Sequence, residues 1–155
     1  MMKGLRVLFV TTEAVPYAKV GGLGDVSGAL PLALERLGAE VTLVLPRYRS
    51  IDLQENGFVP VDKPANWMVG INFVDYPFDV WRGKLPGGNV DVLLIGNDVF
   101  YNRPGIYNHP GGWGYGDEGI RNVFFQKAAL ELCKWAGFHP DIIHCHDHHT
   151  ALLPA

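Results

Sequence analysis

The sequence lacks the features that mark several special classes of protein. Its 155 residues include only two cysteines, Cys133 and Cys145, which is too few for a disulfide scaffold and typical of a reducing compartment. No apolar run approaches the about 20 residues that a membrane-spanning helix needs, and no N-terminal stretch has the form of a secretory signal. We therefore expect a soluble, cytoplasmic protein with no membrane partner.

Charge is also scarce, since 19% of the residues are charged and the net charge is −3. The chain has no cluster of Lys and Arg, so nothing in it supports a nucleic-acid partner. It has no internal repeat and no low-complexity linker. What it does have is a hydrophobic content of 48%, which is enough for one domain with a substantial core.

A glycine-rich stretch at residues 19–25, Lys-Val-Gly-Gly-Leu-Gly-Asp, stands between two apolar segments. The run Val7–Val10 predicts a strand before it, and the periodic residues 26–37 predict a helix after it. Glycines let a ligand approach the backbone, and the free amides of a helix start suit a phosphate. Lys19 adds a positive charge and Asp25 a carboxylate. The spacing matches neither the dinucleotide fingerprint nor a P-loop, so a tight turn that needs glycine only for packing is the alternative.

The other apolar runs predict an α/β domain. Four runs are typical of strands buried in a parallel sheet, and they lie at residues 6–12, 41–45, 92–95 and 141–145. Alternating residues between 67 and 95 predict short antiparallel strands or hairpins added to that sheet. A helix is expected from an N-cap at Asp117 to a stop at Gly137. The predicted fold is Rossmann-like, with a mainly parallel sheet and an antiparallel hairpin extension.

The helix after the glycines carries a proline. Pro31 predicts a kink or a restart of this helix, and Gly38 predicts its end. Its buried face is expected to be the apolar stripe Val26, Ala29, Leu30, Ala33 and Leu37.

Polar residues follow the predicted strands, at the edge where open α/β sheets bind their ligands. Glu13 is either a site residue or a solvated loop acid, and we favour the solvated acid. Arg47 and Arg49 lie where a ligand would be within reach, but we favour a surface loop there. Residues 101–116 are irregular and rich in Gly, Pro and aromatic residues, so they form a candidate functional loop.

Three segments together resemble the signatures of one enzyme family. Residues 19–31 read Lys-Val-Gly-Gly-Leu-Gly-Asp-Val-Ser-Gly-Ala-Leu-Pro, residues 101–107 read Tyr-Asn-Arg-Pro-Gly-Ile-Tyr, and residues 144–154 read His-Cys-His-Asp-His-His-Thr-Ala-Leu-Leu-Pro. In this order they are similar to the signatures of bacterial glycogen synthases and plant starch synthases. The resemblance spans nearly the whole chain.

The resemblance implies two facing Rossmann-like domains with the site in the cleft between them, the architecture called GT-B. It implies transfer of glucose from ADP-glucose, or UDP-glucose, to the non-reducing 4-OH end of an α-1,4-glucan, with retention and without a cofactor. Residues 1–155 would be the N-terminal, acceptor-side catalytic domain, expected to be truncated. The C-terminal nucleotide-binding domain would be a partner absent from this chain, so the isolated chain is expected to be inactive.

The resemblance also assigns roles to seven residues. It makes Asp25 and Asp147 catalytic, and the substrate-binding residues are Lys19, Gly21, Gly22, Tyr107 and Arg121. Simpler roles are open for two of them, since a loop tyrosine can pack on its neighbours and Asp147 can be a helix N-cap. The chain departs from the family at position 148, where His148 replaces a frequent Trp. It also departs at Val20, which replaces a frequent Thr, and at Glu118-Gly119.

A different class of function is indicated by the dense cluster His144, His146, Asp147, His148 and His149. This cluster is similar to the H-x-H-x-D-H pattern of metallo-β-lactamase-type hydrolases, although its Asp comes one residue early. His144 and His146 lie in phase on a predicted strand, and further ligands downstream are missing. We therefore assign no metal site. A zinc-dependent hydrolase and a folded fragment without activity are the alternatives.

Overall fold

The computed structural model describes residues 4–62, 67–135 and 138–155, with the side chain of Trp135 left out. Its elements in chain order are β1 (Arg6–Val10), α1 (Gly22–Arg36), β2 (Glu40–Pro46), β3 (Val59–Pro60), β4 (Met68–Ile71), β5 (Val74–Pro77), β6 (Asp79–Lys84), β7 (Asp91–Gly96), α2 (Asp98–Tyr101), α3 (Glu118–Trp135), β8 (Ile142–Cys145) and the 3-10 helix η1 (His148–Thr150).

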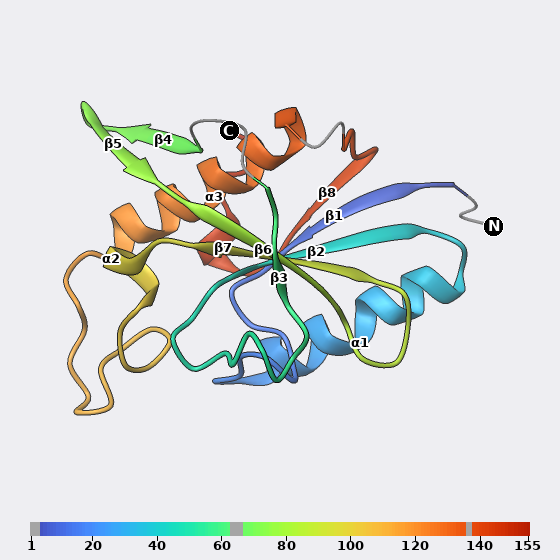
Figure 1. Ribbon diagram of the computed structural model, residues 1–155, viewed down its shortest axis with the longest axis horizontal. Helices are drawn as coiled ribbons and strands as arrows, with labels where there is room; N and C mark the ends of the chain where they lie inside the picture. Colours follow the sequence, from blue (N-terminus) through green and yellow to red (C-terminus); the bar gives the residue numbers. More distant parts are fainter. Residues whose placement is uncertain (1–3, 63–66, 136–137) are drawn as a thin grey trace.

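Within the described residues, the main sheet has six strands in the order β3-β6-β7-β2-β1-β8. Strands β7, β2, β1 and β8 run parallel to one another. Helix α1 lies on one face of the sheet and α3 on the other, below and above the fan of strands in Figure 1. Residues 8–10 of β1 and 43–45 of β2 are wholly buried, as expected for strands covered on both faces. The predicted parallel α/β fold is confirmed.

The antiparallel additions take two forms. Strand β6 pairs antiparallel with β7, and β3 pairs antiparallel with β6, so both extend the main sheet. Strands β4 and β5 instead form a separate two-stranded hairpin. This hairpin lies against α3, and Lys127 Nζ donates a hydrogen bond to the Gly70 carbonyl at 2.7 Å. The predicted hairpin extension is therefore present, but only part of it joins the main sheet.

Helix α1 differs from its prediction in its start and in its buried face. It begins at Gly22, so two of the three glycines lie in its first turn, and it runs through Pro31 without a restart. Its buried residues are small ones and the proline, namely Gly24, Ser27, Gly28 and Pro31. Of the predicted apolar stripe only Leu30 packs against the core, whereas Val26 and Leu37 are 50% and 58% exposed. The small residues allow a closer approach of the helix to its neighbours than a stripe of larger side chains would.

Helix α3 follows its prediction more closely. The helix begins directly after Asp117, and Phe124, Ala128 and Leu132 of its inner face are buried. The Asp117 carboxylate, however, accepts two hydrogen bonds from the Arg103 guanidinium, at 3.1 and 2.7 Å, so it fixes the preceding loop. The expected stop at Gly137 lies outside the described residues.

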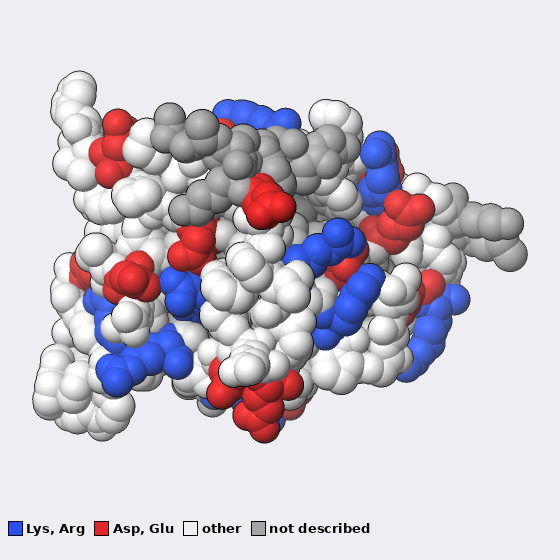
Figure 2. Space-filling view, viewed as in Figure 1, with Lys and Arg blue, Asp and Glu red and all other residues white. Residues whose placement is uncertain are grey.

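The face shown in Figure 2 has no large patch of positive or of negative charge, because Lys and Arg are interspersed with Asp and Glu. This agrees with the small net charge of −3. In the described ranges, no helix is both long enough and apolar enough to cross a membrane.

A substitution at Gly28 tests the close contact of α1 with the segment that follows β1. A Cβ atom at Gly28 would lie 2.3 Å from Val15 Cγ2 and 2.9 Å from the Val15 carbonyl oxygen. Because the backbone must shift to make room, Gly28→Ala should lower the free energy of unfolding by about 1–3 kcal/mol. Chemical denaturation of the protein measures this loss.

Gly119 of α3 provides the matched control. It is also a helical glycine, but a Cβ atom there meets nothing within 4 Å. Gly119→Ala should leave the free energy of unfolding unchanged or raise it by up to about 1 kcal/mol through helix propensity. Equal effects of the two substitutions would contradict the close contact at Gly28.

Candidate functional site

The topology of the sheet makes the ends of β1 and β8 a candidate ligand site. The chain passes from β1 through α1 to β2 on one side, and it returns through α3 on the other face to reach β8 on the far side of β1. Open α/β sheets bind ligands outside the carboxyl ends of the strands at such a change of direction. Residues 11–13 follow β1, and residues 146–149 follow β8. These two groups therefore form the floor of the candidate site.

Glu13 lies at the centre of this site, and the residue is only 4% exposed. Its Oε2 accepts hydrogen bonds from the backbone amides of Val20 and Gly21, at 2.7 and 2.8 Å. Its Oε1 accepts a hydrogen bond from the Tyr107 hydroxyl at 2.8 Å. The favoured interpretation of Glu13 as a solvated loop acid is therefore wrong. The carboxylate joins the end of β1 to the glycine-rich stretch and to the loop between α2 and α3.

These hydrogen bonds determine the charge of Glu13. Burial by itself raises the pKa of the carboxyl, but the amides of Gly21 and Val20 and the Tyr107 hydroxyl outweigh burial, so the pKa lies below its ordinary value of 4.5. Glu13 is therefore ionised at neutral pH and can only accept hydrogen bonds. It follows that Tyr107 donates to Glu13, and that Thr12 Oγ1, 2.8 Å from the Tyr107 oxygen, donates to Tyr107.

Tyr107 is held from two further sides. Its ring stacks on the imidazole of His149, with centroids 4.5 Å apart and an angle of 5° between the planes. Arg121 is 4% exposed, and it donates to the carbonyl oxygens of Ile106 at 3.1 Å and of Tyr107 at 3.2 Å. The Arg121 guanidinium thus binds the backbone of the loop. A substrate-binding arginine would instead direct its charge toward the ligand.

Lys19 and Asp25 lie at the outer side of the glycine-rich stretch. Lys19 Nζ and Asp25 Oδ1 form an ion pair at 2.7 Å, and both side chains are at least half exposed. Asp25 belongs to the first turn of α1, and the backbone of Gly22 starts this helix. The first amides of a helix have no acceptor within the helix. An anion bound here would therefore meet an ammonium group and unpaired amides together.

Asp147 follows β8 and has a positive φ of 64°. Its Oδ1 accepts a hydrogen bond from the His148 amide at 2.6 Å, so it caps η1. The simpler role that the sequence leaves open, an N-cap, is therefore present. The same oxygen lies 2.9 Å from His148 Nδ1, and the carboxylate is about half exposed. Asp147 consequently retains an oxygen that faces solvent on the β8 side of the site.

The histidines of the predicted cluster do not converge on one point. His144 and His146 pack against Phe9 of β1, with ring centroids 5.1 and 4.0 Å from its ring. Burial, with the neighbouring His144, lowers the pKa of His146 to about 4, so this imidazole is neutral. His148 and His149 instead lie near Glu118 of α3, with one ligand atom of each within 4.8 Å of the others.

The two arginines after β2 serve the fold in this structure. The Arg47 guanidinium forms ion pairs with Asp79 at 3.0 Å and with Asp98 at 3.1 Å. The amide of Arg49 donates to the Tyr101 carbonyl at 3.0 Å. The interpretation of this segment as a surface loop, anchored here to β6 and α2, agrees with these contacts.

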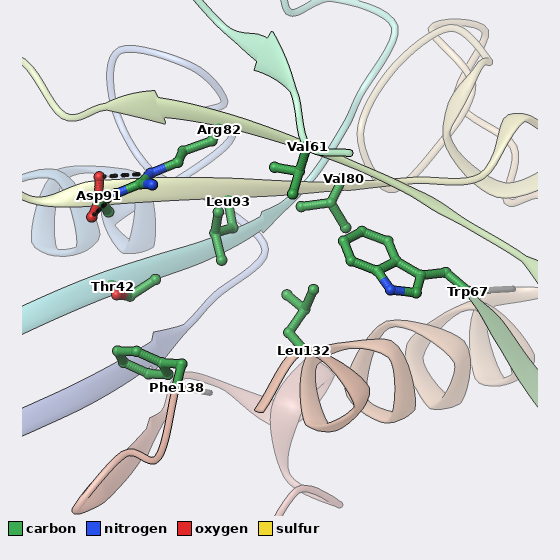
Figure 3. Close-up of a pocket in the computed structure, with 9 residues that line it drawn as sticks. All are labelled: Thr42, Val61, Trp67, Val80, Arg82, Asp91, Leu93, Leu132 and Phe138. Carbon is green, nitrogen blue, oxygen red and sulfur yellow. Dashed lines mark hydrogen bonds and ion pairs between the residues drawn. The ribbon is translucent and has the colours of Figure 1, made fainter. Parts of the chain in front are cut away.

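A pocket of about 480 Å³ lies elsewhere, between the sheet and α3. In Figure 3 its apolar wall includes Val80, Leu93 and Leu132, and the ion pair of Arg82 with Asp91 stands at its rim. None of the seven residues predicted for the site lines this pocket. It is therefore separate from the edge where the strands β1 and β8 end.

Sequence reasoning misjudged one member of the site, Glu13, and did not assign His149 to it. His149 is 5% exposed and stacks on Tyr107, yet it entered the prediction only as a possible metal ligand. The sequence did contain one signal for a buried Glu13, namely its position between a strand end and a glycine-rich stretch. A carboxylate there is near amides that have no other acceptor, which favours a buried role over a solvated one.

The fold and these contacts define an α/β domain of the open, parallel type, with a candidate ligand site at one sheet edge. The starch synthase catalytic domain family matches residues 6–155, and the chain belongs to this family. It is 41% identical over 154 residues to "Glycogen synthase 1" of Geobacter metallireducens, covering 99% of this chain and 30% of that protein. It is 36% identical to "Glycogen synthase" of Thermotoga maritima, covering 97% of this chain and 30% of that protein.

A solved structure agrees with these relatives. The catalytic domain of starch synthase IV from Arabidopsis thaliana, bound to ADP and acarbose, superposes with a TM-score of 0.80 at 34% identity, covering 97% of this chain and 29% of that chain. The chain thus spans about 30% of the length of the curated relatives named above. The zinc-dependent hydrolase is not favoured, because the family match covers the histidine segment itself.

Glu13→Gln tests the buried carboxylate through the pH dependence of stability. Because the folded pKa lies below the ordinary 4.5, the ionised group stabilises the fold fully above that pH, and the contribution is lost as the pH falls through the folded pKa. At pH 7 the substitution should cost about 1–3 kcal/mol of unfolding free energy. The difference between wild type and Glu13→Gln should shrink below pH 4.5 in thermal or chemical denaturation.

Glu35→Gln is the control for this experiment. Glu35 also accepts a hydrogen bond from a backbone amide, that of Asn89 at 2.8 Å, but at an exposed site. Its substitution should cost much less at pH 7. If the difference in unfolding free energy between wild type and Glu13→Gln did not change with pH, the Glu13 carboxylate would not be held in the ionised form.

Proposed function

We propose that this chain is the N-terminal, acceptor-side domain of a retaining glucosyltransferase that elongates an α-1,4-glucan from ADP-glucose or UDP-glucose. The observation that carries the proposal is the convergence of three signature segments at one sheet edge. The glycine-rich stretch meets Tyr107 through Glu13, and Tyr107 meets the segment after β8 through His149. The family match and the ADP in the related starch synthase structure support a sugar nucleotide as donor.

The donor diphosphate is proposed to bind at Lys19 and the start of α1. The exposed ion pair with Asp25 is worth at most about 1 kcal/mol, so the ammonium can turn to a phosphate at little cost. The Gly21 amide already donates to Glu13, so we assign the direct phosphate contact to the Gly22 amide. Gly21 is proposed to contribute only the backbone conformation that places Gly22. Fixed positive charge here favours the transition state, because the diphosphate gains negative charge as it leaves.

The reaction needs no cofactor in this proposal. The bond from the anomeric carbon to the diphosphate oxygen breaks, and a bond from that carbon to the acceptor 4-oxygen forms on the same face. The hydroxyl proton passes to the leaving phosphate oxygen. Asp25 and Asp147 are proposed to face the reacting sugar as carboxylates, and Tyr107 to lie on the sugar side. We assign Arg121 to positioning, since it holds the carbonyls of Ile106 and Tyr107.

The remaining length of the relatives supports a second domain. The chain covers about 30% of them, and a nucleotide-binding domain of the same protein is proposed to close the cleft opposite residues 11–25. The isolated chain is then expected to be inactive. We further propose a cytoplasmic location, in keeping with the free thiols of Cys133 and Cys145.

Lys19→Ala should weaken use of the donor in the full-length enzyme. Loss of the ammonium group should raise the KM for the sugar nucleotide and lower kcat/KM by about tenfold or more, since charge-assisted contacts to phosphate are worth about 1.5–3 kcal/mol. Lys134→Ala removes a comparable ion pair, with Glu131 at 2.6 Å, and should leave the kinetics unchanged. Equal kinetics for wild type and Lys19→Ala would reject the donor site.

Asp25→Ala should lower turnover in the same assay. Its first-turn carboxylate is exposed, so its loss should change the unfolding free energy by less than about 1 kcal/mol. A fall in kcat without a fall in stability would identify a role in the reaction. Turnover equal to that of wild type would remove Asp25 from the proposed site.

Asp147 needs a variant that separates capping from chemistry. Asparagine tolerates a positive φ and is an equally good N-cap, so Asp147→Asn should keep stability while it removes the negative charge. We expect a large loss of kcat in Asp147→Asn, as in Asp147→Ala. If Asp147→Asn retains full turnover, capping η1 is the whole role of this residue.

A further inference from the structure

Trp113 is a large apolar side chain that the fold leaves in contact with solvent, since it is 58% exposed. It lies in the loop between α2 and α3, the same loop that carries Tyr107. Single exposed apolar residues are common on protein surfaces. Exposure alone therefore shows nothing, and what matters is how the ring is held.

The indole of Trp113 is fixed on one side. Its ring stacks on the imidazole of His109, with centroids 4.1 Å apart and planes 13° from parallel. The backbone of Gly111 lies against the edge of its six-membered ring, because a Cβ atom at Gly111 would be 2.0 Å from Cζ3 and 2.4 Å from Cη2. Only a glycine permits this approach. The indole is thus supported on one face while more than half of its surface is exposed.

Backbone hydrogen bonds hold the two stacked rings in this arrangement. The His109 amide donates to the Trp113 carbonyl at 3.0 Å, and the Gly112 amide donates to the His109 carbonyl at 2.8 Å. The Gly111 amide donates to His109 Nδ1 at 3.0 Å, which fixes the imidazole itself. Little conformational freedom remains to be lost when a ligand settles on the indole, so binding there is favoured.

The loop is anchored at both ends, and one of these ends belongs to the candidate site. On one side Arg121 holds the carbonyls of Ile106 and Tyr107. On the other side Arg103 pairs with Asp117 at 2.7 Å and lies 4.3 Å from the centre of the Tyr115 ring. Trp113 is therefore presented by a fixed segment that continues from Tyr107.

We propose that Trp113, supported by His109, is a stacking subsite for a glucose unit of the α-glucan acceptor. A pyranose ring has an apolar face of C–H groups, which a flat, exposed indole matches, while the sugar hydroxyls at the ring edge stay in water. The choice of an α-glucan as ligand rests on the proposed function. The subsite contacts a sugar unit other than the one that reacts, so it contributes affinity for longer acceptors.

Phe73 shows what distinguishes Trp113 from an ordinary exposed aromatic residue. Phe73 is fully exposed at the turn between β4 and β5, and within the described part of the chain its ring stacks on no other ring. It lacks the support that fixes Trp113. Phe73→Ala is therefore a matched control, since it removes an exposed aromatic ring from a different element.

The test measures binding of maltoheptaose to the full-length protein by calorimetry, which needs no catalysis. Trp113→Ala should weaken binding about fivefold to tenfold, as expected for loss of one aromatic stacking contact. Trp113→Phe should keep most of the affinity, and Phe73→Ala should bind like wild type. The KM for the sugar nucleotide should be unchanged in all three variants. Thermal unfolding of each variant verifies that its fold is intact.

His109→Ala provides a second variant that keeps the indole but removes its support, and it should weaken binding by a smaller factor. Wild-type affinity in Trp113→Ala would overturn the subsite, and so would a wild-type protein that does not bind maltoheptaose. Glucosyl transfer is assayed separately with the donor. A protein that binds the glucan through Trp113 but transfers no glucose would refute the proposed function and keep the subsite.

Discussion

One buried carboxylate connects the three segments of the candidate site. Glu13 joins the end of β1, the glycine-rich stretch and Tyr107, which is 94 residues away in sequence. A buried charge is costly unless several donors satisfy it, and here two amides and a hydroxyl do so. If one of these donors moves, the charge loses part of its compensation. The three segments are therefore held in one arrangement by a shared electrostatic constraint.

Around this fixed centre, the groups assigned to the substrate are held more weakly. Lys19 and Asp25 form an exposed ion pair at the outer side of the glycine-rich stretch, and such pairs open at little cost. Glu13 occupies the Val20 and Gly21 amides, which keeps the backbone in place before any ligand arrives. This division suits the proposed transfer reaction, because the framework would stay rigid while the charged side chains exchange a protein partner for a substrate.

The sequence predicted the sheet better than it predicted the site. Continuous apolar runs identify buried parallel strands, because both of their faces are covered. The burial of α1 was predicted incorrectly, because Gly24 and Gly28 pack by being small and so leave no hydrophobic signal. Glu13 was misjudged because its partner Tyr107 becomes its neighbour only in the fold. The family signatures identified Lys19, Tyr107 and Asp147 as candidate site residues. The backbone contacts of Arg121 are visible only in the structure.

The position of β8 in the sheet has a consequence for how the protein forms. β1 is synthesised about 135 residues before β8, yet the two strands pair and join Val7 to Ile142. At a synthesis rate of about 10 residues per second, about 14 seconds pass before that neighbour exists. Until then one edge of β1 stays open to other chains. Newborn copies should therefore depend on chaperones during this interval, and slow translation should increase their aggregation.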